Sequence, residues 1–145
     1  MRTIPSAFVS LIAVMGMFVP ALAQGQASKA TSSQRSQLAS EMKTIAFEFA
    51  ANPEDFALVT KVEELSWKMI LMSEGISSCV LPAYDLPQQM TALNSTYAMM
   101  VNSMNSMGNM PEAVKKQSMA AFEGPINGQK RKVGMVLENV IKYCK

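Results

Sequence analysis

The stretch PQQMTALNSTYAMMVNSMNSMGNM, residues 87–110, places an apolar residue at every third or fourth position. This spacing predicts an amphipathic helix whose other sides carry asparagine and serine. Because most of the apolar seam is methionine, it is either an adaptable packing surface or a row of thioether ligands. The seam consists of Met90, Leu93, Tyr97, Met100, Met104 and Met107.

The helical period also occurs before this stretch. A first helix, capped by Ser32 or Ser33, is predicted to end near Asn52, because Pro53 disfavours helical geometry in the residue before it. Pro53 suits the first turn of a second helix that ends at a left-handed Gly75. The seams of these two helices are Leu38, Met42, Ile45 and Phe49, and then Leu58, Val62, Leu65, Met69 and Met72.

Three further segments complete the chain. Residues 76–86, which contain Pro82, read as a connection. After the helix that starts at Pro87, a short helix is predicted over residues 111–122, followed by breaks at Gly124-Pro125 and Asn127-Gly128. A last helix then starts near Gln129, and its seam is Val133, Leu137, Val140 and Cys144.

These elements predict an all-α fold, since no stretch alternates with period two for long enough to form a strand. We expect a single antiparallel helical bundle of four main helices plus one short helix, over residues 34–145. A flexible leader, residues 24–33, and a cleaved signal peptide, residues 1–23, are predicted to precede it.

The signal peptide is predicted from three features at the start of the chain. Arg2 is followed by an apolar run from Phe8 to Val19, and Ala21-Leu22-Ala23 matches a small-x-small cleavage site. A retained anchor is the alternative, but the run is shorter than the roughly 20 residues of a spanning helix. We therefore expect a periplasmic or secreted protein without stable membrane insertion after cleavage.

The two cysteines, Cys79 and Cys144, are predicted to form a disulfide. An exported chain meets an oxidising environment, in which a cysteine pair is most simply a bridge. The seam of the last helix also brings Cys144 to the core side. Two free thiols or a pair of soft metal ligands are the alternatives.

Composition argues against catalysis. The chain contains no histidine, the commonest general base and transition-metal ligand, and it lacks the glycine-rich, serine-hydrolase and zinc-protease motifs. Neighbouring carboxylates such as Glu63 and Glu64 point about 100 degrees apart on a helix and cannot share a metal. The formal net charge of +2 predicts no general attraction to nucleic acid. We expect neither an enzyme nor a resident cofactor.

A methionine metal site is the alternative to a methionine packing surface. The run Met104-x-x-Met107-x-x-Met110 resembles soft-metal motifs in periplasmic proteins that handle copper and silver. Thioethers prefer Cu(I) and Ag(I) and remain neutral at every pH. However, three residues is also the spacing that a helical core requires, so Met104 and Met107 are already explained by the seam.

Binding is the function that the pattern favours. Methionine surfaces repack around varied apolar partners, so the seam is predicted to grip a partner helix or a small apolar ligand. A cavity would be completed by Phe49, Leu65 and Met69. An inhibitor or immunity protein against a secreted enzyme is a further alternative. The predicted binding residues are Met90, Tyr97, Met100, Met104 and Met107.

Two positions off the seams have alternative interpretations. Trp67 either packs against a third helix or, if exposed, marks a partner surface. Asn94 begins the glycosylation pattern Asn94-Ser95-Thr96, which matters only in a eukaryotic secreted protein.

Overall fold

The computed structural model describes residues 21–145 and contains four helices, with no strand in that range. They are α1 (Ala21–Ala51), α2 (Phe56–Met72), α3 (Ser77–Ser106) and α4 (Glu112–Tyr143). The predicted all-helical bundle is confirmed. The predicted signal peptide lies, over residues 1–20, outside the described residues.

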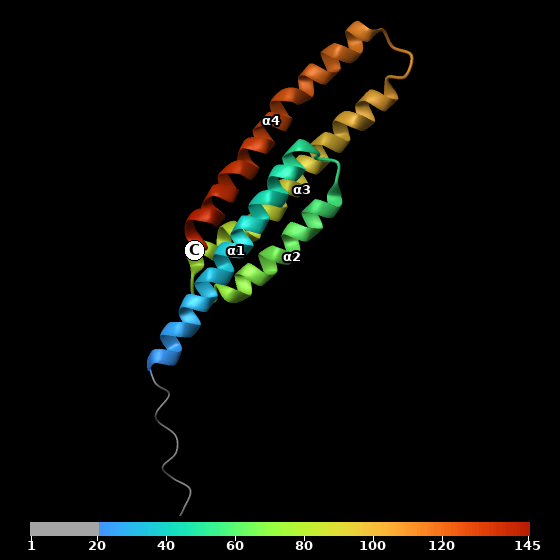
Figure 1. Cartoon of the computed structure of the whole chain (residues 1–145). Helices are drawn as coiled ribbons and strands as arrows, with labels where there is room; N and C mark the ends of the chain where they lie inside the picture. The colour runs from blue at the N-terminus through green and yellow to red at the C-terminus, as the bar shows by residue number, and fades with distance from the viewer. Residues whose placement is uncertain (1–20) are drawn as a thin grey trace, which may run out of the picture.

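The helices run alternately up and down, joined by short turns (Figure 1). α1 packs on α2, α2 on α3, α3 on α4, and α4 closes the ring against α1. This is the arrangement expected when antiparallel neighbours are connected by short loops. Within residues 21–145, no helix combines the length and the apolar character of a membrane span.

The core lies where all four helices are present, and each helix contributes part of its predicted seam. Its largest fully buried side chains are Met42 and Phe49 from α1, Val62 and Met69 from α2, Leu86, Met90 and Leu93 from α3, and Val140 from α4. Three of these eight side chains are methionine, which adapts to irregular gaps between helices.

α1 and α2 differ from the sequence prediction only at their starts. Residues 24–33, the predicted leader, lie within α1, and their alanine and glutamine residues have high helix propensity even without an apolar seam. α2 starts at Phe56 because the Asp55 carboxylate accepts a hydrogen bond from the Ala57 N–H at 3.1 Å and caps the helix. Gly75, in the next turn, has the predicted left-handed φ of +84°.

α3 corrects the predicted connection over residues 76–86. The helix begins at Ser77 and contains both Pro82 and Pro87, each of which removes one backbone hydrogen bond. A continuous buried seam compensates for this loss, because side chains spaced by four, three and four residues are all fully buried. These side chains are Cys79, Ala83, Leu86 and Met90.

α4 corrects the predicted break in the C-terminal region. The predicted short helix and last helix are one helix that passes through Gly124 and Pro125. Pro125 leaves the Ala121 carbonyl without its helical donor, but both residues are exposed, so water can supply the hydrogen bond. The partly buried Phe122 and Ile126 continue the seam across the predicted break.

The Cys79–Cys144 disulfide, predicted from the sequence, closes one end of the bundle, which we call the base. It joins the first turn of α3 to the residue that caps the end of α4, with Cα atoms 4.9 Å apart. Arg35 of α1 lies at the same end. Its two terminal nitrogens donate to the carbonyl oxygens of Met72, at 3.3 Å, and Lys145, at 3.2 Å. Three segments therefore meet around one guanidinium.

We predict that reduction of the disulfide lowers the free energy of unfolding by about 2–4 kcal/mol, because the unfolded chain gains conformational freedom. Urea unfolding followed by circular dichroism, with and without reductant, measures this difference. The Cys79→Ala/Cys144→Ala variant is the control, since its stability should not respond to reductant. Equal free energies for oxidised and reduced protein would contradict the prediction.

Candidate functional site

The methionine seam of α3 is divided between two environments. Met90 is fully buried in the four-helix core. Further along the same helix, three side chains are only half-buried, those of Tyr97, Met100 and Met104. Met107, the residue that caps the end of the helix, is 8% exposed. The structure therefore does not place the five predicted binding residues in one site. Met90 belongs to the core, and the other four lie beyond it.

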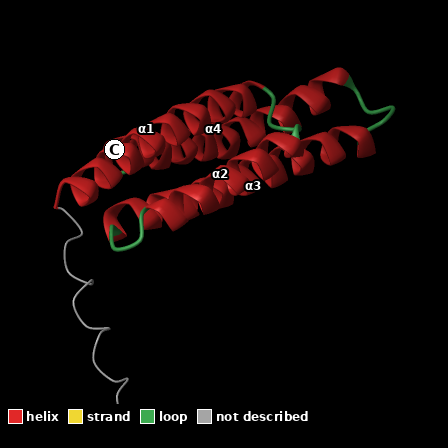
Figure 2. Cartoon of the chain, turned by 60° about the horizontal axis from the view of Figure 1, so that its bottom comes forward, coloured by secondary structure: helices red, strands yellow, loops and turns green. Residues whose placement is uncertain are grey.

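This division follows from unequal helix lengths. α2 has 17 residues and α3 has 30, which correspond to about 25 Å and 45 Å of helix. The turn from α2 to α3 and the disulfide both lie at the base, so the additional length of α3 extends from the opposite end (Figures 1 and 2). α4 accompanies α3 along this extension. We call residues 97–126 the projecting hairpin.

Asn94 marks the level at which the hairpin leaves the bundle. Its side-chain nitrogen donates a 2.7 Å hydrogen bond to the carbonyl oxygen of Pro53, in the turn between α1 and α2. Past this level, α3 and α4 have only each other as helical neighbours (Figure 2).

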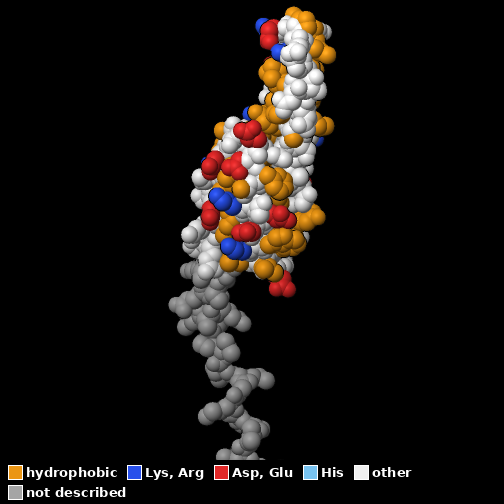
Figure 3. Space-filling model, turned by 90° about the vertical axis from the view of Figure 1, so that its right-hand side faces the viewer, with side chains coloured by type: hydrophobic (Ala, Val, Ile, Leu, Met, Phe, Trp, Pro, Cys, Tyr) orange, Lys and Arg blue, Asp and Glu red, His pale blue; other side chains and the backbone are white. Residues whose placement is uncertain are grey.

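The projecting hairpin carries many methionines and few charges. Six of the 14 methionines of the chain lie in it, and its only charged residues are two acidic and two basic ones. Hydrophobic side chains are visible along this narrow part of the molecule (Figure 3). Its exposed large apolar side chains are Met99, Met110, Val114 and Met119. Exposed apolar side chains on a surface without net charge are typical of a contact site.

Sequence periodicity recognises only part of this surface. Met99 and Met110 fall outside the predicted seam, whereas Val114 and Met119 belong to the apolar side of the predicted short helix. All four are exposed because α1 and α2 end before they can cover the hairpin. Charge density would not have found the surface, because residues 76–96, within the bundle, carry only one charged side chain and residues 97–126 carry four.

The three predicted metal ligands lie on successive turns at the tip of the hairpin. The Met107 N–H donates to the Met104 carbonyl at 3.1 Å, and the Met110 N–H donates to the Met107 carbonyl at 2.7 Å. Their side chains differ in exposure, since Met104 is half-buried, Met107 nearly buried and Met110 49% exposed. Within residues 21–145, histidine, cysteine and carboxylate side chains form no cluster of three that could hold a metal.

The residues predicted to complete an apolar cavity are part of the core instead. Phe49 and Met69 are fully buried, and Leu65 is nearly so. Two pockets lie elsewhere and neither is lined by methionine: one between α2 and α3, and a wider groove between α3 and α4 near the base. Tyr84 borders both. Trp67 lines the first pocket and is 53% exposed, so it is not part of the core.

Compared with known proteins, the chain matches no family model, no curated protein sequence and no solved structure.

We predict that Met99 and Met110 are oxidised by hydrogen peroxide about tenfold or more faster than Met42, Met69 and Met90, because the peroxide reaches buried thioethers only when the bundle opens. Peptide mass spectrometry over a time course gives the individual rates. In urea the rates should converge. Equal rates for Met90 and Met99 in the folded protein would show that the division between core and hairpin is wrong.

Proposed function

We propose that this chain is an exported binding protein without catalytic activity, and that it contacts a protein partner through the apolar surface of the projecting hairpin. The observation that carries the proposal is the extension of α3 and α4 past α1 and α2. An uncovered pair of helices adds nothing to the four-helix core, and it leaves exposed apolar side chains in place. A partner that covers them would supply the missing burial.

The chemistry of the surface supports an apolar protein partner. Methionine side chains are flexible and polarisable, so they adapt to the side chains of an apposed helix. The hairpin has equal numbers of acidic and basic residues, so charge attraction to nucleic acid or to anionic lipid does not contribute. An apolar face of a partner helix fits this surface better than a small ligand, because the seam residues within the bundle are packed.

Export is supported by two independent features. The N-terminal sequence has the pattern of a signal peptide, and the disulfide at the base is of a kind that persists in oxidising compartments. We therefore place the protein in the periplasm or outside the cell. A secreted enzyme, blocked by the hairpin, is one class of partner that this location allows.

We predict that Met99→Glu/Met119→Glu weakens binding of an environment-sensitive apolar dye, and capture of partners from an extract of the same compartment, by about tenfold or more. Each substitution places a charge in the contact surface. Because both side chains are exposed, the free energy of unfolding should change by less than about 0.5 kcal/mol. Dye fluorescence and quantitative pull-down measure the two effects.

Met135→Glu is the matched control, because Met135 is also an exposed methionine and lies in α4, outside the hairpin. It should bind dye and partner as the unchanged protein does. Absence of dye binding to the folded, oxidised protein, or equal losses in the two variants, would contradict the proposal.

A Cu(I) or Ag(I) carrier is the second candidate, and the placement of Met104, Met107 and Met110 on successive turns favours it. If the hairpin binds a partner protein, replacing all three methionines with leucine keeps the surface apolar, so partner capture should be retained. In that case the Cu(I) affinity should change by less than about threefold. Competition titration with a Cu(I) chelator measures the affinity. A loss of tenfold or more would support the metal carrier instead.

A further inference from the structure

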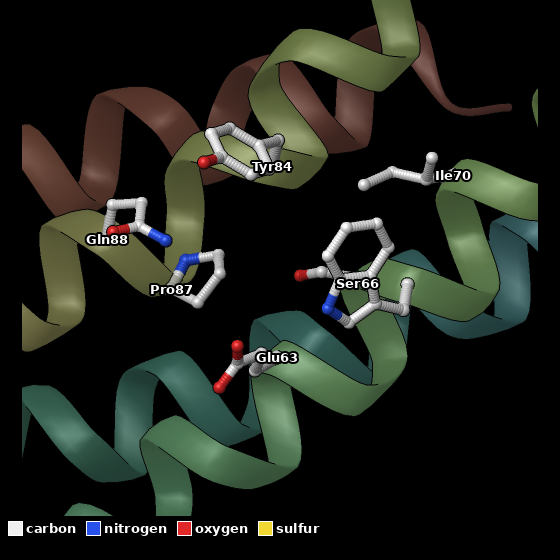
Figure 4. Close-up of a pocket in the computed structure, with 7 residues that line it drawn as sticks. Glu63, Ser66, Ile70, Tyr84, Pro87 and Gln88 are labelled. Carbon is white, nitrogen blue, oxygen red and sulfur yellow. The ribbon is translucent and has the colours of Figure 1, made fainter.

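The pocket between α2 and α3 is distinct from the projecting hairpin and lies within the four-helix part of the molecule. α2 contributes residues spaced three and four apart, so they share one face of the helix, and α3 does the same from the opposite side. The lining residues are Glu63, Ser66, Trp67 and Ile70 from α2, and Tyr84, Pro87 and Gln88 from α3 (Figure 4).

Two aromatic side chains lie at this pocket without being part of the core. Trp67 is 53% exposed and Tyr84 is 54% exposed, although both are large enough to contribute substantially to packing. Tyr84 extends over the space that faces α2 (Figure 4). Exposed tryptophan and tyrosine at a concave site are the residue types that dominate binding energy at interfaces, and the faces of their rings attract cations.

The charge of the pocket has one sign. Glu63 lies on its rim, and none of its seven lining residues is basic. Among residues from Ser32 onward, the one salt bridge joins Glu112 and Lys115 in α4, so no lysine or arginine there neutralises Glu63. The Glu63 carboxylate therefore remains available to a cation from outside.

An unsatisfied hydroxyl lies at the floor of the same pocket. Ser66 is 2% exposed, and its Oγ has no hydrogen-bond partner. Pro87 opposite offers no N–H to it (Figure 4). A buried polar atom without a partner costs free energy, and a donor that enters from the pocket would remove this cost.

We propose that this pocket binds a guanidinium group, presented by an arginine side chain of a partner protein. A guanidinium is planar and stacks on aromatic rings, and its five N–H donors can pair with a carboxylate and still reach a hydroxyl or amide oxygen. Trp67 and Tyr84 supply the ring faces, and the acceptors are the Glu63 carboxylate, Ser66 Oγ and the Gln88 amide oxygen. A quaternary ammonium has no N–H donor and would leave all three acceptors unused.

The arginine site goes beyond the proposed hairpin function and does not depend on it. Tyr84 also borders the groove between α3 and α4, so the backbone that carries the arginine has space beside the pocket. The variants that test the hairpin change neither α2 nor the first half of α3. Failure of either proposal is therefore seen separately from failure of the other.

The test uses Trp67, the only tryptophan of the chain, as a fluorescent reporter. The probe is the peptide acetyl-Gly-Arg-Gly-amide, titrated into the full oxidised protein. We expect a saturable change in fluorescence with a Kd of the order of 1 mM. Glu63→Gln and Tyr84→Ala should each weaken binding about fivefold or more, since they remove the charge-assisted hydrogen bonds and one ring face.

Glu64→Gln is the matched control, because Glu64 is exposed and adjacent but does not line the pocket. It should keep the original Kd, and the neutral peptide acetyl-Gly-Gln-Gly-amide should show no saturation. Absence of saturation with the arginine peptide, equal binding of the glutamine peptide, or equal losses in Glu63→Gln and Glu64→Gln would each overturn the proposal. Agmatine is a small molecule that carries a guanidinium group. If it binds more tightly than the arginine peptide, the ligand of the pocket is a free small molecule, and the assignment to an arginine of a partner protein is overturned.

Discussion

The disulfide between Cys79 and Cys144 sets the geometry on which the remaining structure depends. It fixes the start of α3 against the end of α4 at the base of the bundle, where the turn from α2 also arrives. With that end fixed, the part of α3 that exceeds the length of α2 can extend only from the opposite end of the bundle. The projecting hairpin is the consequence of the short turn that joins α2 to α3 at the base, of the disulfide that holds α4 there, and of helices of 17, 30 and 32 residues.

The same constraint gives the methionines two different physical roles. Within the four-helix part, α3 is surrounded by helices, and the Met90 side chain fills space in a closed core. Farther along, only α4 accompanies it, so Met99 and Met119 remain in contact with water. The side chains are methionine in both places. The number of neighbouring helices therefore decides whether they are buried or exposed. Flexible thioethers suit both roles, because they pack into irregular gaps and adapt to incoming surfaces.

The two proposed contact surfaces differ in their chemistry. The projecting hairpin exposes apolar side chains and has no net charge, so its interactions would gain free energy from burial and would discriminate little between partners. The pocket beside Trp67 combines aromatic faces with the Glu63 carboxylate, a pairing that selects for charge and shape. A partner that uses both would gain affinity from the first and specificity from the second.

Local patterns by themselves determined the all-helical fold, many of the buried seam residues and the cysteine pair. Leu93, Val133 and Val140 are buried as their spacing predicts, because a three-to-four residue period places side chains on one face whatever that face contacts. Proline and glycine were poor guides to helix ends. Pro82, Pro87 and Pro125 lie inside helices, since the burial of neighbouring residues or access to water offsets each missing hydrogen bond. The sequence around a proline does not show whether burial or water will offset its missing hydrogen bond.

Only the tertiary structure decided which apolar residues face water. The sequence alone indicates that Met90, Met100 and Met104 share one face of a helix, but it does not show how far the neighbouring helices reach along that face. How much of that face is covered depends on the relative lengths of the helices and on the end of the bundle at which the disulfide joins α3 to α4. Both are properties of the assembled bundle. The convergence of Glu63, Ser66 and Tyr84 has the same origin, because residues from two helices form a pocket only after those helices have packed.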